Sequence, residues 1–303
     1  MEGQLHGREG EGTEERCSHE LFSDLIYVYA ISRVTLLIEE PTGVIVSPTS
    51  FGRYIVLTLV VLQAWLYMVN YVNRYGKWKW FEYAIAIINM AAMVYVANTI
   101  SSDWEKMHTT FNIGMLIMLV TVALLYFIQT RLKEQDPAAA KNSLHILGVV
   151  CFVYVVAIVA GVLGTSSEII IWIDVAVVLC GAFLPFFIRG HFDIAIIDWP
   201  HLVERFELLV IITFGEAVVD MTSYFDVASF TVIPLMVFGV ILLQFGSYVT
   251  QIHNLVEHRS QQRGLLLMFS HYFIVIAVNM MTVALKLPEE GLFRKSRTKE
   301  IYA

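Results

Sequence analysis

Ionisable side chains interrupt several long hydrophobic stretches of this 303-residue sequence. Asp24 and Arg33 lie within the first stretch, and Arg205 and Glu216 lie within a later one. An ionisable group at the centre of a bilayer costs about 2.5–3.5 kcal/mol on insertion scales, so such groups face a partner, a cavity or the membrane interface. A carboxylate and an arginine held there can form a structural ion pair, carry protons or bind a charged solute.

The spacing of these groups indicates which helices must touch. His201, Arg205 and Glu216 fall on one helical face, but Arg205 and Glu216 are roughly 16 Å apart along the axis and cannot pair with each other. Asp24 and Arg33 offer the complementary order of charges. We therefore predict contact through Asp24–Arg205, Arg33–Glu216 or both, although Asp24 and Arg33 lie about 180° apart around a straight helix.

Two interpretations of the charged groups follow. Glu20, His201 and Glu204 lie near helix ends, where contact with headgroups and water accounts for them, and the deeper groups can form structural ion pairs. The alternative is a pathway for a substrate or a proton. The candidates for such a pathway are Asp24, Arg33, His201, Glu204, Arg205 and Glu216.

Other polar side chains recur at helical spacing in the remaining stretches. Gln63 and Asn70 share one face, and Asn89 shares a face with Glu82. Hydrogen bonds between membrane helices are worth about 0.6 kcal/mol on average, which favours a packing role for these groups. The predicted helix-packing polar residues are Gln63, Asn70, Asn89, Asp174, Gln244 and Asn279.

The sequence gives little support for a metal, a cofactor or an enzyme. His201 and Glu204 have the i, i+3 spacing of some metal ligands, but no second motif completes a set of three or four. The three cysteines match no zinc spacing. No nucleophile elbow, phosphate loop or HExxH motif is present. We expect no metal, no cofactor and no enzyme activity; His201, Glu204 and His271 are the only start of an intramembrane catalytic site.

Membrane-spanning helices are the elements predicted to position these residues. Hydrophobic residues make up 57% of the chain and charged residues 16%, whereas about 25% is charged in soluble proteins. A helix needs about 20 apolar residues to cross a bilayer. The sequence thus predicts an all-α polytopic transmembrane bundle of about nine spans in a lipid bilayer. They lie near 20–38, 52–72, 80–100, 110–130, 143–163, 168–188, 201–219, 229–250 and 264–285.

Charged residues outside these stretches predict the domains and the orientation. Residues 1–19 read as a disordered cytoplasmic tail, 20–285 as the transmembrane helical domain, and 286–303 as a polar C-terminal tail. Lys and Arg concentrate in the loops at 73–79 and 131–142. By the positive-inside rule these loops and the N-terminus are cytoplasmic. No basic patch of the kind that binds nucleic acid is present.

An internal repeat is a further hypothesis. Nine spans place the basic C-terminal tail outside, against the same rule. Gln63 aligns with Gln244 and Asn89 with Asn279, in the same order along helices one to three and seven to nine. The match is either a coincidence between apolar segments or the parallel repeat of some transporters. In the second case the chain is an incomplete pair of parallel six-helix repeats.

Three motifs carry a resemblance to a known family. They are residues 20–31 (ELFSDLIYVYAI), 73–76 (NRYG), and 201–206 (HLVERF) running on to 214–216 (FGE). Together they resemble the low temperature requirement protein A (LtrA) family of bacterial membrane proteins. The resemblance implies a multi-pass protein of the bacterial cell membrane that is required for growth at low temperature, and it implies no particular reaction.

Two functions are favoured on this basis. The first is a solute or proton-coupled transporter that uses the intramembrane charges, with a small solute or a proton as its partner. The second is a non-transporting membrane sensor or assembly partner. Transport predicts a water-accessible cavity at the face of Asp24, Arg205 and Glu216, whereas dry and fully paired contact among these groups favours the second function.

Overall fold

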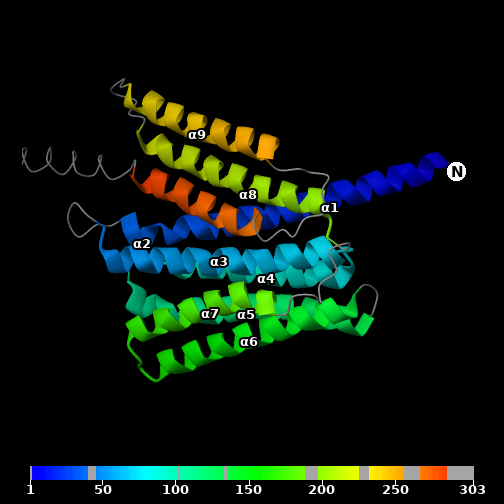
Figure 1. The fold of residues 1–303 in the computed structure, drawn as a ribbon, viewed down its shortest axis with the longest axis horizontal. Coiled ribbons are helices and arrows are strands. Elements are labelled where there is room, and N and C mark those ends of the chain that lie inside the picture. The colour runs from blue at the N-terminus through cyan, green and yellow to red at the C-terminus, as the bar shows by residue number, and fades with distance from the viewer. Residues whose placement is uncertain are drawn as a thin grey trace, which may run out of the picture.

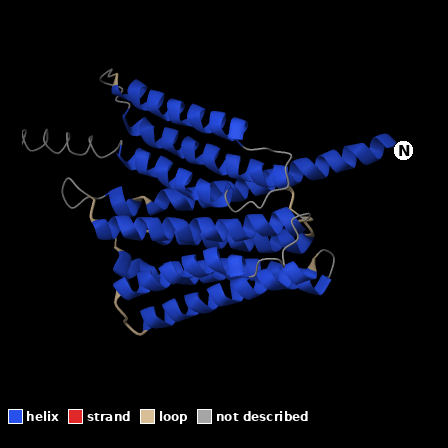
Figure 2. Ribbon diagram, in the orientation of Figure 1, coloured by secondary structure: helices blue, strands red, loops and turns tan. Residues whose placement is uncertain are grey.

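The computed structural model describes residues 2–39, 46–101, 103–132, 136–187, 197–224, 232–255 and 267–284. Within these ranges the chain is almost wholly helical and contains no strand (Figure 2). The long helices run up and down beside one another and form one bundle (Figure 1). The predicted all-α polytopic architecture is therefore confirmed.

The hydrophobic stretches fold as long helices joined by short connections. Eight of the helices in the described ranges are long and apolar enough to cross a membrane. The helices are α1 (Glu2–Val34), α2 (Leu36–Glu39), α3 (Pro48–Tyr75), α4 (Trp80–Thr99), α5 (Trp104–Leu132), α6 (Pro137–Val162), α7 (Ser167–Phe187), α8 (Trp199–Asp220), a 3-10 turn η2 (Met221–Tyr224), α9 (Ile233–Leu255) and a last helix, Leu267–Ala284.

Helix α8 is long enough to cross a membrane but is more charged than the eight apolar helices. It nevertheless lies between α1 and α9 and runs alongside both (Figure 1). Its apolar residues Leu202, Phe206 and Val210 are buried in the bundle. Together with the eight apolar helices, α8 accounts for the nine stretches predicted from the sequence, as far as the described residues extend.

The start of α8 is fixed by local chemistry. Asp198 occupies the N-cap position, and its carboxylate accepts a hydrogen bond from the backbone N–H of His201 at 3.3 Å. Pro200 lies in the first turn, where a missing N–H costs no hydrogen bond. The cap places His201 in the first turn of the helix and Arg205 one turn further along.

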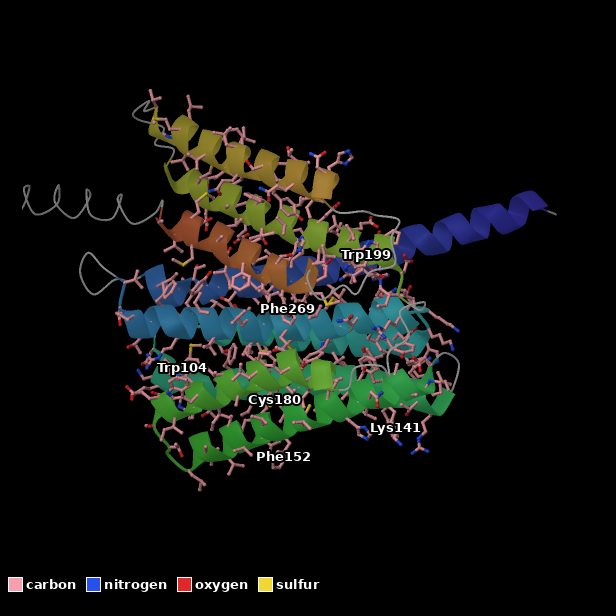
Figure 3. All side chains as sticks on the ribbon, viewed as in Figure 1. Trp104, Lys141, Phe152, Cys180, Trp199 and Phe269 are labelled. Carbon is pink, nitrogen blue, oxygen red and sulfur yellow. The ribbon has the colours of Figure 1, made fainter. Side chains whose placement is uncertain are left out.

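The bundle has a packed interior and an apolar exterior. Trp65 on α3 and Phe206 on α8 are fully buried, and their rings meet edge to face with centroids 5.0 Å apart. Leu243 on α9 and Phe152 on α6 are exposed, and Figure 3 shows Phe152 on the outer side of its helix. Lipid chains are as apolar as these side chains, so such a surface fits a bilayer.

The two tails predicted from the sequence stay predictions. Residues 2–19 are drawn as the first part of α1, which extends beyond the end of the bundle in Figure 1, and the disorder predicted there is not tested by this arrangement. The C-terminal tail, 286–303, lies outside the described residues. The cytoplasmic side assigned to the N-terminus stays a prediction.

The closest approach of α3 and α7 gives a test of this packing. A Cβ atom on Gly181 would lie 1.8 Å from the Gln63 amide nitrogen and 2.3 Å from the Tyr67 hydroxyl, whereas a Cβ on Gly148 in α6 meets nothing within 4 Å. We expect Gly181→Ala to lower the melting temperature, because overpacking costs about 1–3 kcal/mol. Gly148→Ala is the control and should leave it unchanged or raise it, since alanine favours helix. Tryptophan fluorescence during heating in detergent measures both, and equal melting temperatures would contradict the close packing.

Candidate functional site

Two helices that are distant in the sequence place four ionisable side chains opposite one another. Helix α1 carries Glu20 and Asp24 one turn apart, and α8 carries His201 and Arg205 with the same spacing. Residues four apart lie on the same face of a helix. The packing of α1 against α8 therefore brings two carboxylates to face an imidazole and a guanidinium. We call Glu20, Asp24, His201 and Arg205 the charged site.

Arg205 binds both carboxylates. Its Nη1 donates to Glu20 Oε2 at 2.6 Å, and its Nη2 donates to Asp24 Oδ1 at 2.5 Å. All three side chains are buried. The planar guanidinium fork suits such a contact because its donors are fixed in direction and remain charged. One arginine thus joins two successive turns of α1 to α8.

Two indole groups complete the contacts of the carboxylates. Trp65 on α3 donates from Nε1 to Asp24 Oδ1 at 2.7 Å. Trp78, between α3 and α4, donates from Nε1 to Glu20 Oε1 at 3.2 Å. Its backbone has a φ of 51°, in the left-handed region that a tryptophan rarely adopts. Buried carboxylates need such donors to offset lost hydration. The unusual backbone conformation of Trp78 places one of these donors at Glu20.

The two ring nitrogens of His201 contact different helices. Asn73 Nδ2 on α3 donates to the Asp198 backbone carbonyl at 2.8 Å and lies 3.3 Å from His201 Nδ1. A carbonyl only accepts, so the NH2 group of Asn73 lies on this side and faces Nδ1. His201 Nε2 lies 2.7 Å from Glu20 Oε2 on α1, and a carboxylate oxygen accepts from it. His201 therefore joins α8 to both α1 and α3.

One carboxylate of the charged site is only partly satisfied. Asp24 Oδ2 and Arg205 Nε are buried and make no hydrogen bond in the described structure. Asp24 therefore receives both of its donors, Arg205 and Trp65, on Oδ1 and retains one unused carboxylate oxygen.

A small pocket opens beside the charged site. Its volume is ≈ 70 Å³, enough for a few water molecules or a small ion. Glu20 and Arg205 line it, together with His19, Trp78 and Tyr83, whose rings contact one another. The His201 side chain is 21% exposed. The site is therefore buried around Asp24 and more exposed at the end where α8 begins, which is marked by Trp199 in Figure 3.

The structure brings together some of the predicted residues and separates others. The predicted Asp24–Arg205 ion pair is present. Arg33 and Glu216, by contrast, form no ion pair with each other in the described residues, and Glu204 is exposed. The reason is geometric: the face of α1 that presents Asp24 to α8 turns Arg33 away.

Glu20 is the residue that sequence reasoning misjudged. Its place at the end of a hydrophobic stretch favours contact with headgroups, yet the structure buries it between Arg205, His201 and Trp78. The sequence does contain a pattern that indicates this burial. Glu20 and Asp24 have the same four-residue spacing as His201 and Arg205, so two packed helices can form two contacts, Glu20 with His201 and Asp24 with Arg205, rather than one.

Asn89 joins three helices. Its carbonyl oxygen accepts from the Tyr27 hydroxyl on α1 at 2.8 Å, and its amide donates to Thr121 Oγ1 on α5 at 2.8 Å. Tyr27 lies less than one turn from Asp24 on the same helix. The Asn89 contacts therefore hold α1 in place within one turn of Asp24, a member of the charged site.

The other polar candidates occupy different surroundings. Gln63 is buried against Tyr67 of its own helix, and Asn70 donates to a backbone carbonyl of its own helix at 2.9 Å. Asn279 is buried, whereas Gln244 is exposed on α9. The two aligned glutamines of the proposed repeat thus differ in environment, and the repeat stays a hypothesis.

The residues that could have begun a catalytic site are dispersed. His271 lies 3.2 Å from the Tyr248 hydroxyl and 2.7 Å from the Leu267 carbonyl. In the part of the chain that the structure describes, no hydrogen bond joins it to His201 or Glu204. Within the same residues, no group of three or more His, Cys, Asp or Glu side chains is arranged to hold a metal ion.

The shared arginine gives a stability test. We expect Arg205→Met to lower the free energy of unfolding by about 3–5 kcal/mol, because it leaves two buried carboxylates without their cation. The triple variant Glu20→Gln, Asp24→Asn, Arg205→Met removes the charges together and should recover much of this loss. Thermal unfolding in detergent measures both. A triple variant that is no more stable than Arg205→Met would show that charge balance is not what holds α1 to α8.

Comparison with known proteins places the chain in a family. The model of the bacterial low temperature requirement A protein (LtrA) matches residues 17–294. No curated protein and no solved structure matched. The matched range includes all four members of the charged site and every helix from the buried part of α1 onward. This chain belongs to the bacterial LtrA family.

Proposed function

We propose that this multi-pass membrane protein is a proton-coupled transporter and that the charged site binds the proton. The observation that carries the proposal is that Asp24 is wholly buried and its Oδ2 makes no hydrogen bond. A buried carboxylate oxygen without a donor is costly, because it has lost its hydration and gained no hydrogen bond in return. A proton on Oδ2 lowers that cost, so this oxygen favours proton uptake.

Two atoms can receive the proton. Asp24 Oδ2 makes no hydrogen bond and lies in the buried part of the site. His201 Nδ1 lies at the open end and accepts from Asn73. These two atoms support a path in which a proton enters at His201 and moves toward Asp24 by way of Glu20.

Protonation of His201 has a structural consequence. A proton on Nδ1 turns this atom into a donor, and it then faces the NH2 group of Asn73, which is also a donor. The contact between them is lost, and Asn73 also holds the Asp198 carbonyl at the N-cap of α8. Proton uptake therefore loosens the start of α8. A transporter needs such a link between proton binding and helix movement.

The pocket supports access from one side of the bundle. At ≈ 70 Å³ it admits water or a small ion, and it touches both Glu20 and Arg205. A proton or a small ion suits this volume, whereas a sugar or a peptide does not. The partner that we propose is therefore a proton, together with a small solute that uses another state of the protein.

A second function has one observation in its favour. Both oxygens of Glu20 are hydrogen-bonded and Arg205 contacts two carboxylates, as expected for a structural clamp. On this reading the protein is a non-transporting sensor or assembly partner, and the charged site only fixes α1 against α8. The two functions differ in whether the site exchanges a proton.

Charge displacement after a pH jump tests the proposal. Proteoliposomes adsorbed on a solid-supported membrane give a transient current when a protein binds protons within the membrane, even without the coupled solute. We expect a transient from the wild-type protein and its loss in Asp24→Asn and in His201→Gln. Glu204→Gln is the matched control, because Glu204 is exposed and lies on the same helix.

Folding must be checked for each variant by its unfolding temperature and its elution in detergent. A folded wild-type protein that gives no transient would overturn the proposal and favour the non-transporting function. A transient that survives both substitutions would place proton binding elsewhere in the molecule.

A further inference from the structure

A second polar cluster lies in the part of the bundle formed by α5, α6 and α7, away from the helices of the charged site. Asp174 on α7 and Asn112 on α5 are 0% exposed, and so is Tyr154 on α6. No hydrogen bond is made by either carboxylate oxygen of Asp174, by either amide atom of Asn112 or by the Tyr154 hydroxyl. Buried polar groups are nearly always hydrogen-bonded, so three unpartnered side chains together call for an explanation.

The three side chains lie at one depth. Asp174 lies seven residues after the start of α7 at Ser167, and Asn112 lies eight after the start of α5 at Trp104. Tyr154 lies eight residues before the end of α6 at Val162. At about 1.5 Å per residue, each is roughly 10–12 Å from the same end of the bundle. These helices pack against each other there.

The groups also face one another. Asn112 is the polar side chain next to the Asp174 carboxyl, and Tyr154 interacts electrostatically with the same carboxyl. No ion pair reaches Asp174 in the described residues, since the ion pairs there involve other side chains. A carboxylate at this place therefore has no cation among the described residues, and the Asn112 amide beside it makes no hydrogen bond of good geometry to it.

We propose that Asp174, Asn112 and Tyr154 form a binding site for one small alkali-metal cation, for which Na⁺ is the probe. Four oxygen atoms are available without breaking any hydrogen bond: two from Asp174, one from Asn112 and one from Tyr154. Carboxylate and carbonyl oxygens are hard ligands that suit hard cations. A single positive charge balances the single carboxylate.

Other occupants fit less well. A divalent cation would leave a charge of +1 in an apolar interior, and Ca²⁺ takes six to eight oxygen ligands, often from several carboxylates. A proton on Asp174 would also neutralise the charge, and the carboxylic acid could then exchange hydrogen bonds with Asn112 and Tyr154; the comparison of salts at fixed pH separates this case from a bound cation. The alkali-metal cation is the occupant that contacts an oxygen atom of all three side chains at once.

The proposal does not depend on proton transport by the charged site. The charged site is built from α1 and α8, whereas the Asp174 cluster is built from α5, α6 and α7. Each can be present without the other. If both are present, the cation adds a second species whose gradient the protein can use.

Thermal unfolding in different salts tests the cation site. The full-length protein in detergent is heated at fixed pH and ionic strength in NaCl, KCl or choline chloride. Ligands that bind only the folded state raise its melting temperature in a saturable way. We expect Na⁺ to raise it by several degrees relative to choline, and Asp174→Asn to abolish this response. Asp103→Asn is the control, because Asp103 is an exposed aspartate outside the helices.

Tyr154→Phe is a second test variant, which keeps the proposal testable if Asp174→Asn does not fold. Phenylalanine fills the same space and removes only the hydroxyl, so we expect a folded protein whose half-maximal Na⁺ concentration rises several-fold. Equal melting temperatures of the wild-type protein in all three salts would overturn the proposal. So would a Na⁺ response that persists in Asp174→Asn but is lost in Asp24→Asn, because the cation would then bind at the charged site.

Discussion

The fork of Arg205 is the contact on which the arrangement of α1 and α8 depends. Apolar side chains alone give membrane helices little reason to choose one neighbour over another, since lipid is equally apolar. A guanidinium that binds two carboxylates one turn apart does discriminate, because sliding or rotating either helix breaks at least one of the bonds at 2.6 and 2.5 Å. Trp65 then links one of these carboxylates, Asp24, to α3. The register of three helices follows from one side chain.

The two polar centres of the bundle differ in how their carboxylates are satisfied. Glu20 has donors for both of its oxygens, and Asp24 has two donors on one oxygen. Asp174 has none in the described structure. A satisfied centre can hold helices together in every state of the protein, and under the proposed function the unused Asp24 Oδ2 adds proton binding to that role. An unsatisfied centre contributes no such bonds, so an occupant explains it better than packing does.

The sequence predicts the architecture and part of the charged site. Helical stretches and the Asp24–Arg205 pair follow from hydrophobic length and from the order of charges along two segments. Glu20 is not predicted to be buried because the groups that bury it, Trp78 and His201, come from a loop and another helix that a single-helix pattern cannot place. The role of Asn73 is hidden for the same reason, since its partners lie 125 and 128 residues away. Arg33–Glu216 shows the converse: charge order allows the pair, and helical geometry prevents it.

Helix α8 shows how the charged site constrains assembly of the whole protein. Each ionised side chain costs about 2.5–3.5 kcal/mol at the centre of a membrane helix, so α8 alone is poorly suited to lipid. Arg205 loses that cost only when Glu20 and Asp24 are already beside it, and these residues belong to α1, which precedes α8 in the chain. Insertion of α8 is therefore coupled to the presence of α1, some 180 residues earlier in the chain. The same contact that gives α1 and α8 their register thus also makes the two helices assemble as one unit, and under the proposed function a proton bound there would act on both helices together.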